Sequence, residues 1–318
     1  MSILNKYVDK VYVINLDKDV DRMKKLDAQL KANGIEYTRF SAVNGSKVIH
    51  SKYLTEYCNT FCTDGMKGCA LSHRAIWEDV VANNYSHVCI LEDDAHIADN
   101  FNEEFDKSWK QLSKKYDIFY LGCGMRCTDT APIPTLINTI QGTTPEVISK
   151  NILSVSGSMG THGYIISNKC AKLIYTLPIL THIDSQLEIW IDKFALSAYS
   201  SNPLLITTFE DRETDIKNSN LSETFPLLLN SVLHQIPFSD DFYLDWSLSE
   251  NFMKIGPFNI NAILLVFVSS ILFLPRYTHK VIVLWLLIEF LVSFDIKNTI
   301  KFVVFGFIAY FIRNLVKV

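Results

Sequence analysis

Positive charge is not in excess in this chain. Lysine and arginine together number 30 against 34 aspartates and glutamates, which gives a formal net charge of -4 and a pI near 6.1. A protein that binds nucleic acid usually carries a basic patch or stripe, so we expect no nucleic-acid partner. The first seven residues, Met1 to Tyr7, contain no apolar run of the length that a secretory signal needs. No N-terminal export signal is therefore expected.

Cysteine is also sparse, with seven residues in 318. A secreted disulfide framework is dense and even in number, so this set does not indicate one. Cys58/Cys62 and Cys123/Cys127 each have a CxxxC spacing, but no further cysteine or histidine completes a zinc pattern. We therefore expect ordinary reduced thiols.

Long apolar runs are lacking up to about Ile255 and dominate the chain from Phe258 onward. This change in composition predicts two domains, residues 1–255 and 256–318. Residues 258–275 are eighteen positions without a charge, about 27 Å as a helix, and form a transmembrane candidate. The shorter runs 281–294 and 302–312 could span with help, form a hairpin or lie in the interface.

A buried helical subdomain is the alternative to membrane association for this tail. Its positive charges are divided almost evenly among the loops, so they predict no orientation. Without an export signal and with reduced thiols, we expect a membrane-associated protein whose first domain faces the cytosol.

Stretches typical of strands alternate with stretches typical of helices in the first domain. The helix expected at residues 68–83 has Leu71, Ile76 and Val80 on one face. Such alternation predicts an α/β fold with a mostly parallel sheet. The segment 125–145 has no clear period, which predicts a loop over the ligand edge of that sheet. The expected strands cover residues 10–15, 35–40, 88–91, 117–121, 160–167 and 203–207.

Three carboxylates, Glu92, Asp93 and Asp94, directly follow the apolar strand at residues 88–91. Ligands of open α/β sheets bind beyond the carboxyl ends of strands, so the three acids fall at an expected site. Adjacent carboxylates repel one another unless a divalent cation neutralises them. A metal that also binds a diphosphate fits this pattern. A solvated turn that caps the next helix is the alternative.

Two further positions have both a structural and a functional interpretation. His73 lies in the first half of the helix expected at residues 68–83, where a lone histidine is most often a hydrogen-bonded core residue. Asp184 precedes a helical pattern and could be only an N-cap.

Six stretches in a fixed order resemble glycosyltransferase family 25, the lipopolysaccharide and procollagen galactosyltransferase group. The resemblance is strongest over residues 10–200, and six ordered stretches are more specific than any one alone. It implies a GT-A-like nucleotide-sugar-binding sandwich. An enzyme of this family would transfer a hexose, generally galactose or glucose, from a UDP-sugar with inversion at the anomeric carbon. Mn²⁺ or Mg²⁺ would be the cofactor. The stretches are VYVINLDKDVDR, RFSAVNG, KGCALSHRAIW, CILEDDA, YLG and GTHGYIISNKCAKLI.

The resemblance also implies roles for the acidic cluster. Asp94 would be the leading metal ligand, with Asp93 as a second ligand, and Glu92 and Asp93 would face the nucleotide sugar. A metal held by these carboxylates would stabilise the charge that develops on the leaving diphosphate.

Other matched residues would bind the donor. Asn15, Asp17 and Arg22 match the opening motif near the base and ribose, and Arg22 could also bind phosphate. Ser72 and His73 match the third motif and are candidates for the donor site.

An inverting transferase also needs a group that removes the proton of the acceptor hydroxyl. We expect Asp184 to be this base, and His162 to be a catalytic alternative or a second metal ligand. Residues 66–67 and 211–213 depart from the family pattern, which leaves the acceptor open.

Three functions therefore compete. The first is a membrane-anchored hexosyltransferase acting on a glycan, glycolipid or glycoprotein acceptor. A sugar nucleotidyltransferase is the second, although no glycine-rich, lysine-containing phosphate loop follows the first strand. The third is a catalytically silent membrane protein that binds a glycan or nucleotide.

Overall fold

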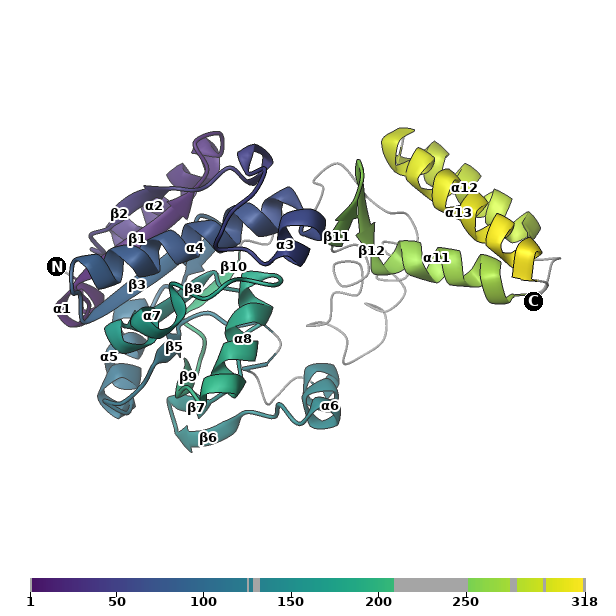
Figure 1. Cartoon of the computed structure of the whole chain (residues 1–318). Helices are drawn as coiled ribbons and strands as arrows, with labels where there is room; N and C mark the ends of the chain where they lie inside the picture. The colour runs from purple at the N-terminus through teal and green to yellow at the C-terminus, as the bar shows by residue number, and fades with distance from the viewer. Residues whose placement is uncertain are drawn as a thin grey trace. The chain divides into compact units, whose positions relative to one another are not determined.

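The computed structural model describes residues 2–124, 126–127, 132–208, 251–274, 279–293 and 296–316 (Figure 1). The chain divides into two compact units. Unit 1 comprises Met1–Thr60 and Asp64–Glu213, and unit 2 comprises Phe61–Thr63 and Thr214–Val318. Residues 211–213, which depart from the family's sequence pattern, lie outside the described residues.

Unit 1 is built on an eight-stranded sheet with the order β2-β1-β3-β8-β5-β9-β7-β6. The central strands are apolar and buried; Val88, Cys89 and Ile90 of β3 are completely inaccessible. The strands of unit 1 are β1 (Lys10–Asn15), β2 (Thr38–Ser41), β3 (His87–Glu92), β4 (Ala95–Ile97), β5 (Ile118–Tyr120), β6 (Glu146–Ser149), β7 (Ile152–Ser154), β8 (Gly163–Ser167), β9 (Ala198–Ser201) and β10 (Ile206–Thr208). β4 and β10 form a separate antiparallel pair.

The prediction of an α/β fold is confirmed, but the prediction of a mostly parallel sheet is wrong. Of the seven described strand pairs in this eight-stranded sheet, β1–β2, β1–β3 and β5–β9 are parallel and the other four are antiparallel. The cause is β8, which enters between β3 and β5 in the opposite direction, and the β6–β7 hairpin at one edge. The sheet is therefore mixed.

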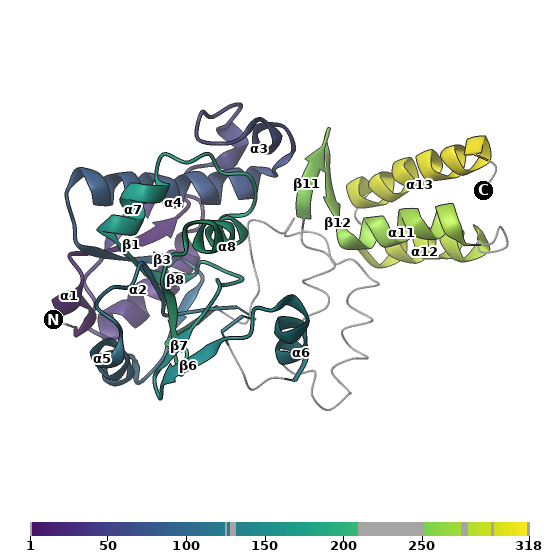
Figure 2. The ribbon, with the colours of Figure 1, turned by 60° about the horizontal axis from the view of Figure 1, so that its bottom comes forward.

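Helices cover both faces of the sheet (Figure 2). Alternate residues of β1 point to opposite faces. Val11 and Val13 therefore join the core formed with α2 and α5, whereas Tyr12 reaches Asp79 of α4 on the other face. The helices are α1 (Leu4–Tyr7), α2 (Val20–Ala32), η1 (Gly45–Lys47), α3 (Glu56–Phe61), α4 (Asp64–Ala82), α5 (Phe101–Gln111), α6 (Pro132–Gln141), α7 (Asn168–Ile174) and α8 (Ile183–Phe194). Part of the segment 125–145, predicted to be a loop, is thus helix α6.

Unit 2 contains the apolar tail. β11 (Asn251–Ile255) and β12 (Phe258–Asn261) form a hairpin, followed by α11 (Ala262–Phe273), α12 (His279–Ser293) and α13 (Ile296–Val316). The prediction of one long helix over residues 258–275 is wrong because its first four residues pair with β11 and the side chain of Asn261 caps a shorter helix. Among the described residues, no helix combines the length and apolar character needed to span a bilayer.

Candidate active site

The functional residues predicted from the sequence gather at one edge of the sheet. β1, β3 and β5 run in the same direction, because β8 is antiparallel to both β3 and β5. The ends of these strands therefore present Asn15, Glu92 and Gly122 at the same edge, where β8 begins after His162. This is the edge at which open α/β sheets bind ligands.

Asp93 and Asp94 share one guanidinium group. Arg22 Nη2, from the first turn of α2, lies 3.0 Å from Asp93 Oδ1 and 3.2 Å from Asp94 Oδ2. Asn15 Nδ2 donates to Asp93 Oδ2 at 2.7 Å. Burial raises the pKa of Asp93 to about 6, although Arg22 and Asn15 act in the opposite direction. Burial, followed by the charge of Glu92, also raises the pKa of Asp94.

Glu92 differs from its two neighbours because it is surrounded by donors. Thr161 Oγ1 donates to Glu92 Oε1 at 2.5 Å, and His73 Nε2 lies 3.3 Å from the same oxygen. Burial is the largest single influence and would raise the pKa of Glu92, but the hydrogen bonds from His73 and Thr161 and the charges of His73 and His162 together outweigh it, so the pKa lies well below its usual value. Glu92 is therefore the carboxylate of the three that stays ionised most readily.

His73 is completely buried and is held in one orientation. Its Nδ1 lies 2.9 Å from the hydroxyl of Tyr164, which accepts a hydrogen bond from Trp77 Nε1 at 3.0 Å. The Tyr164 hydroxyl then donates to Nδ1, which leaves the proton on Nε2 for Glu92. His73 thus acts on the site through Glu92, as a buried hydrogen-bonded histidine.

The site contains oxygen atoms suited to a divalent cation. Asp94 Oδ1 is buried and accepts no hydrogen bond from the described residues, and Asp93 lies beside it. Carboxylate oxygens are the ligands that Mn²⁺ and Mg²⁺ prefer. The two aspartates therefore fit the predicted metal, and Asp94 offers an oxygen with no other partner among these residues.

A second group of possible ligand atoms includes Glu92 itself. Cys69, His73 and Glu92 each place one ligand atom within 4.8 Å of the others. Sulfur and nitrogen ligands suit zinc better than manganese. Burial raises the pKa of the Cys69 thiol well above its usual value, which disfavours the thiolate needed for metal binding.

Asp184 lies in the first turn of α8, within electrostatic reach of Glu92. Burial raises its pKa, the charge of His182 acts in the opposite direction, and Glu92 adds to the rise. Asp184 Oδ1 accepts a hydrogen bond from the backbone of Ser185 at 2.6 Å. The structure therefore places Asp184 within electrostatic reach of the acidic cluster and raises its pKa, while its role as the base stays a prediction.

His162 is wedged beneath the edge of the sheet. A Cβ atom at Gly122 would lie 2.5 Å from His162 Nε2, and the His162 ring is hydrogen-bonded to the backbone of Ile206. Burial lowers the pKa of His162, so the ring is neutral. Its role as a base or a metal ligand stays a prediction, and this packing favours Asp184 as the base.

The remaining predicted residues have partners within the protein. Ser72 Oγ accepts a hydrogen bond from Val43 N at 2.8 Å, which joins α4 to the loop after β2. Asp17 is exposed and lies 2.6 Å from Arg39 Nη2, and Arg39 Nε donates to Asn15 Oδ1 at 2.7 Å. Arg39, which the sequence analysis did not single out, thus joins Asp17 to Asn15. It lies in the RFSAVNG stretch, which is the signal that could have identified it.

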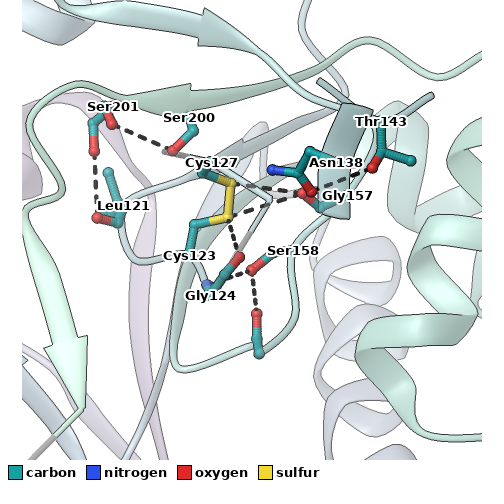
Figure 3. The surroundings of a disulfide bond; sticks show 11 residues. Leu121, Cys123, Gly124, Cys127, Asn138, Thr143, Gly157, Ser158, Ser200 and Ser201 are labelled. Carbon is teal, nitrogen blue, oxygen red and sulfur yellow. Dashed lines mark hydrogen bonds between the residues drawn. A yellow bond between two sulfur atoms is a disulfide. The ribbon is translucent and has the colours of Figure 1, made fainter. Parts of the chain in front are cut away.

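The prediction of reduced cysteines is wrong for four of the seven. Cys123 and Cys127 form a disulfide with their Cα atoms 5.8 Å apart (Figure 3). Cys58 and Cys62 are also disulfide-bonded. Cys69, Cys89 and Cys170 are free thiols. Disulfides persist in oxidising compartments. The expectation of a cytosol-facing domain therefore loses the support that reduced cysteines gave it.

Comparisons with known proteins agree on a family. The model described as Glycosyltransferase family 25 (LPS biosynthesis protein) matches residues 8–186, more than half of the chain. A Drosophila melanogaster glycosyltransferase 25 family member is 26% identical over 63% of this chain and 35% of its own length. Mouse procollagen galactosyltransferase 2 is 24% identical over 65% of this chain and 37% of its own length. The chain thus spans little more than a third of these two relatives.

Two solved structures are similar at lower levels. A197 from STIV has a TM-score of 0.34 and 15% identity, with 65% of this chain and 97% of that one covered. Mouse xyloside xylosyltransferase 1 has a TM-score of 0.28 and 12% identity, with 60% and 64% covered. Both scores are low, so the description of the fold rests on its own topology. The match over residues 8–186 shows that the chain belongs to glycosyltransferase family 25.

Proposed function

We propose that this chain transfers a hexose from a UDP-sugar to an acceptor hydroxyl, with inversion and with the help of Mn²⁺ or Mg²⁺. One observation carries the proposal: the unpartnered carboxylate oxygen of Asp94 lies at the same sheet edge as a second aspartate of raised pKa, Asp184. The first suits a cation that binds a diphosphate, and the second suits a base. A transferase of this class needs both groups.

In this mechanism Asp94 and Asp93 would hold the metal. A bound divalent cation stabilises the negative charge that develops on the leaving diphosphate. Arg22 now neutralises both aspartates, and its guanidinium would be available to a phosphate oxygen once a cation takes over that task. Asn15 keeps Asp93 in place during this exchange.

Asp184 would accept the proton of the acceptor hydroxyl. The hydroxyl oxygen forms a bond to the anomeric carbon while the bond from that carbon to the diphosphate oxygen breaks, and UDP leaves with the electron pair. The raised pKa makes Asp184 a stronger base than an exposed aspartate. His73 and Thr161 hold Glu92 ionised beside the reacting groups.

The relatives support hexose transfer as the reaction class. Procollagen galactosyltransferases are among them, and the family description names lipopolysaccharide biosynthesis. We therefore propose galactose or glucose as the transferred sugar and a glycan, glycolipid or glycoprotein as the acceptor, on a GT-A-like fold.

A UDP-release assay tests the proposal. The full chain would be incubated with a panel of nucleotide sugars and Mn²⁺, alongside Asp94→Ala and the matched control Asp99→Ala, an exposed aspartate on the following turn. We expect one UDP-hexose to release UDP, Asp94→Ala to lose at least about a hundredfold in rate, and Asp99→Ala to match the wild type. Metal-dependent release that survives Asp94→Ala would contradict the assigned site.

A catalytically silent binding protein is the alternative. Human inactive glycosyltransferase 25 family member 3 is 31% identical over 36% of this chain and 22% of its own length. Binding of UDP without turnover of any donor would favour this alternative. Release of pyrophosphate from a nucleoside triphosphate and a sugar phosphate would instead identify a nucleotidyltransferase.

We propose further that unit 2 associates with a lipid surface. Phe307, Phe311 and Leu315 follow one another at every fourth position of α13, and their exposed fractions are 70%, 56% and 67%. Such a stripe of exposed apolar residues suits the boundary between headgroups and acyl chains. Flotation with phosphatidylcholine vesicles tests this. Phe307→Asp/Phe311→Asp should weaken flotation, whereas Ile49→Asp in unit 1 should not.

A further inference from the structure

The loop that follows β5 is closed by a disulfide at the ligand edge of the sheet. Cys123 and Cys127 form this disulfide (Figure 3). Arg126 lies between them in the sequence and is therefore part of a ring of five residues. β5 is parallel to β1 and β3, which places this ring at the same edge as the acidic cluster. None of the roles proposed above uses this arginine.

The ring packs tightly on the segment before β8. The two sulfur atoms lie 3.9 Å and 3.6 Å from the carbonyl oxygen of Gly157, and because a disulfide carries no proton these are packing contacts. Gly124 N donates to Ser158 Oγ at 3.3 Å. A Cβ atom at Gly124 would lie 1.9 Å from Met159 O, so only glycine permits this approach. The disulfide-closed loop is therefore held in one position against the segment before β8.

The same segment rests on α8. A Cβ atom at Gly157 would lie 3.0 Å from Glu188 Cβ, which shows how closely the backbone approaches this helix. Arg126 is paired with Glu188, and its guanidinium group also feels the charge of Asp184, one turn earlier on α8. The ring thus places the guanidinium group of Arg126 against α8, the helix that carries the proposed base.

Arg126 is incompletely satisfied. Its side chain is 14% exposed, and Nη2 donates to Gln141 Oε1 at 3.3 Å, whereas Nε is buried without a hydrogen-bond partner among the described residues. An arginine side chain remains charged when buried, and its planar fork of donors matches phosphate oxygens. A buried charged group with a free donor is costly unless a ligand completes it.

We propose that Arg126 binds the diphosphate of the nucleotide donor and that the Cys123–Cys127 disulfide positions it for that task. This inference rests on the proposed function, because it concerns the same donor. Arg22 approaches from the helix after β1 and Arg126 from the loop after β5, so the diphosphate would meet a cation from each of two different strand ends. Reduction of the disulfide releases the ring and the arginine with it.

Reduction is a balanced step when a dithiol such as dithiothreitol supplies it. Two electrons and two protons convert the disulfide to the thiols of Cys123 and Cys127, and the dithiol becomes a cyclic disulfide. The ring opens, and the loop is no longer held against the segment before β8.

Calorimetric titration of the full chain with UDP and with uridine, both in the presence of Mn²⁺, tests the assignment without requiring turnover. Arg126→Ala should weaken UDP binding by about ten- to a hundredfold, the loss expected for a charge-assisted hydrogen bond, and leave uridine binding within about twofold. Arg126→Lys should recover part of the loss. A chain that binds neither compound would contradict the proposed donor itself rather than the role of Arg126.

If Arg126 is only a structural clamp that joins the loop to Glu188 of α8, different results are expected. It would lower UDP and uridine affinity by the same factor in Arg126→Ala, or leave both unchanged, and either result would overturn the assignment. Glu188→Gln removes the clamp while keeping the arginine, so a loss of UDP affinity equal to that of Arg126→Ala would also overturn it.

The disulfide is tested by the paired variant Cys123→Ser/Cys127→Ser, with Cys58→Ser/Cys62→Ser as the control for the other two disulfide-bonded cysteines. The first pair should bind UDP as weakly as the dithiothreitol-treated wild type and show no further response to the reductant. The control pair should bind UDP normally until it is reduced. Wild-type affinity in the first pair would refute the positioning role of the disulfide.

Discussion

Asn15 and Asp93 join two neighbouring strand ends, because the side-chain amide of Asn15 donates to the carboxylate of Asp93 at 2.7 Å. The same amide nitrogen donates to the backbone oxygen of Asp19 at 2.9 Å, and the amide oxygen accepts from Arg39. Asn15 thus fixes the acidic cluster relative to the loop that leads to Arg22.

Replacement of Asn15 should therefore loosen Asp93. A hydrogen bond to a charged group contributes about 1.5–3 kcal/mol, so Asn15→Ala should raise the donor KM by about tenfold or more. It should also raise the Mn²⁺ concentration needed for half-maximal rate. Steady-state kinetics measure both effects, with the exposed Asn83→Ala as control. Unchanged metal dependence would show that Asp93 does not contribute to the metal site.

The two groups of metal ligands predict different metals. We expect Mn²⁺ to bind at Asp93 and Asp94, so that Cys69→Ser keeps its metal-stimulated rate within about twofold, since hard cations prefer carboxylate oxygens. Elemental analysis of the purified wild type and both Cys69→Ser and Asp94→Ala is the measurement. Stoichiometric zinc that disappears in Cys69→Ser would instead assign the metal to the cluster of Cys69, His73 and Glu92.

The pH dependence of the rate should reveal Asp184. A base must be deprotonated, and burial raises the pKa of Asp184, so activity should fall as the pH drops through that raised value. Asp184→Asn should lose about a hundredfold or more in kcat at every pH, whereas Asp192→Asn on the same helix should not. If the rate of Asp184→Asn still falls at low pH, the group whose protonation lowers the rate is not Asp184. Among the described residues, the charged and titratable groups that interact with Asp184 include His182, Glu92, Cys69, Tyr120 and Arg126, and Glu188 lies one turn further along α8.

The same raised pKa has an effect of opposite sign on stability. The folded protein binds the Asp184 proton more tightly than the unfolded chain, so stability falls as the pH rises through the folded pKa. Asp184→Asn is neutral throughout and should melt at a higher temperature than the wild type above that pKa. Thermal melts at several pH values measure this, and a lower melting temperature across the range would contradict it.

Ser72 should matter for stability rather than for catalysis. Ser72→Ala leaves the backbone N–H of Val43 without its acceptor and should cost about 1 kcal/mol, or about 2–4 °C in Tm. The exposed Ser46→Ala serves as control. A raised donor KM with an unchanged Tm would return Ser72 to the donor site that the sequence motif suggested.

The centre of the site could be predicted from the sequence because β3 and its acids are local. A buried apolar strand followed by Glu92, Asp93 and Asp94 needs no long-range information. The contact of His73 with Glu92 could not be predicted from the sequence, since it depends on how α4 packs on the sheet. The reversed direction of β8 was equally hidden, because an apolar run has the same composition in either direction.

Arg126 and the tail show two other limits. Arg126 lies in a stretch without periodicity, and the role proposed for it depends on the disulfide, which spacing alone did not establish. Composition identified the apolar tail as helical, but the pairing of β12 with β11 depends on residues outside the apolar run. Both outcomes were decided by contacts between segments rather than by local preference.

The pairing of β10 with β4 ties residues 206–208 to the acidic cluster. Thr208 pairs with Ala95, the residue after Asp94, and the backbone of Ile206 is hydrogen-bonded to the His162 ring. A protein shortened to end before Ile206 would lose the strand that flanks the acidic cluster. A fluorophore attached at Thr208 would lie beside the cluster, so a change in its emission on addition of Mn²⁺ or UDP would test whether they bind there.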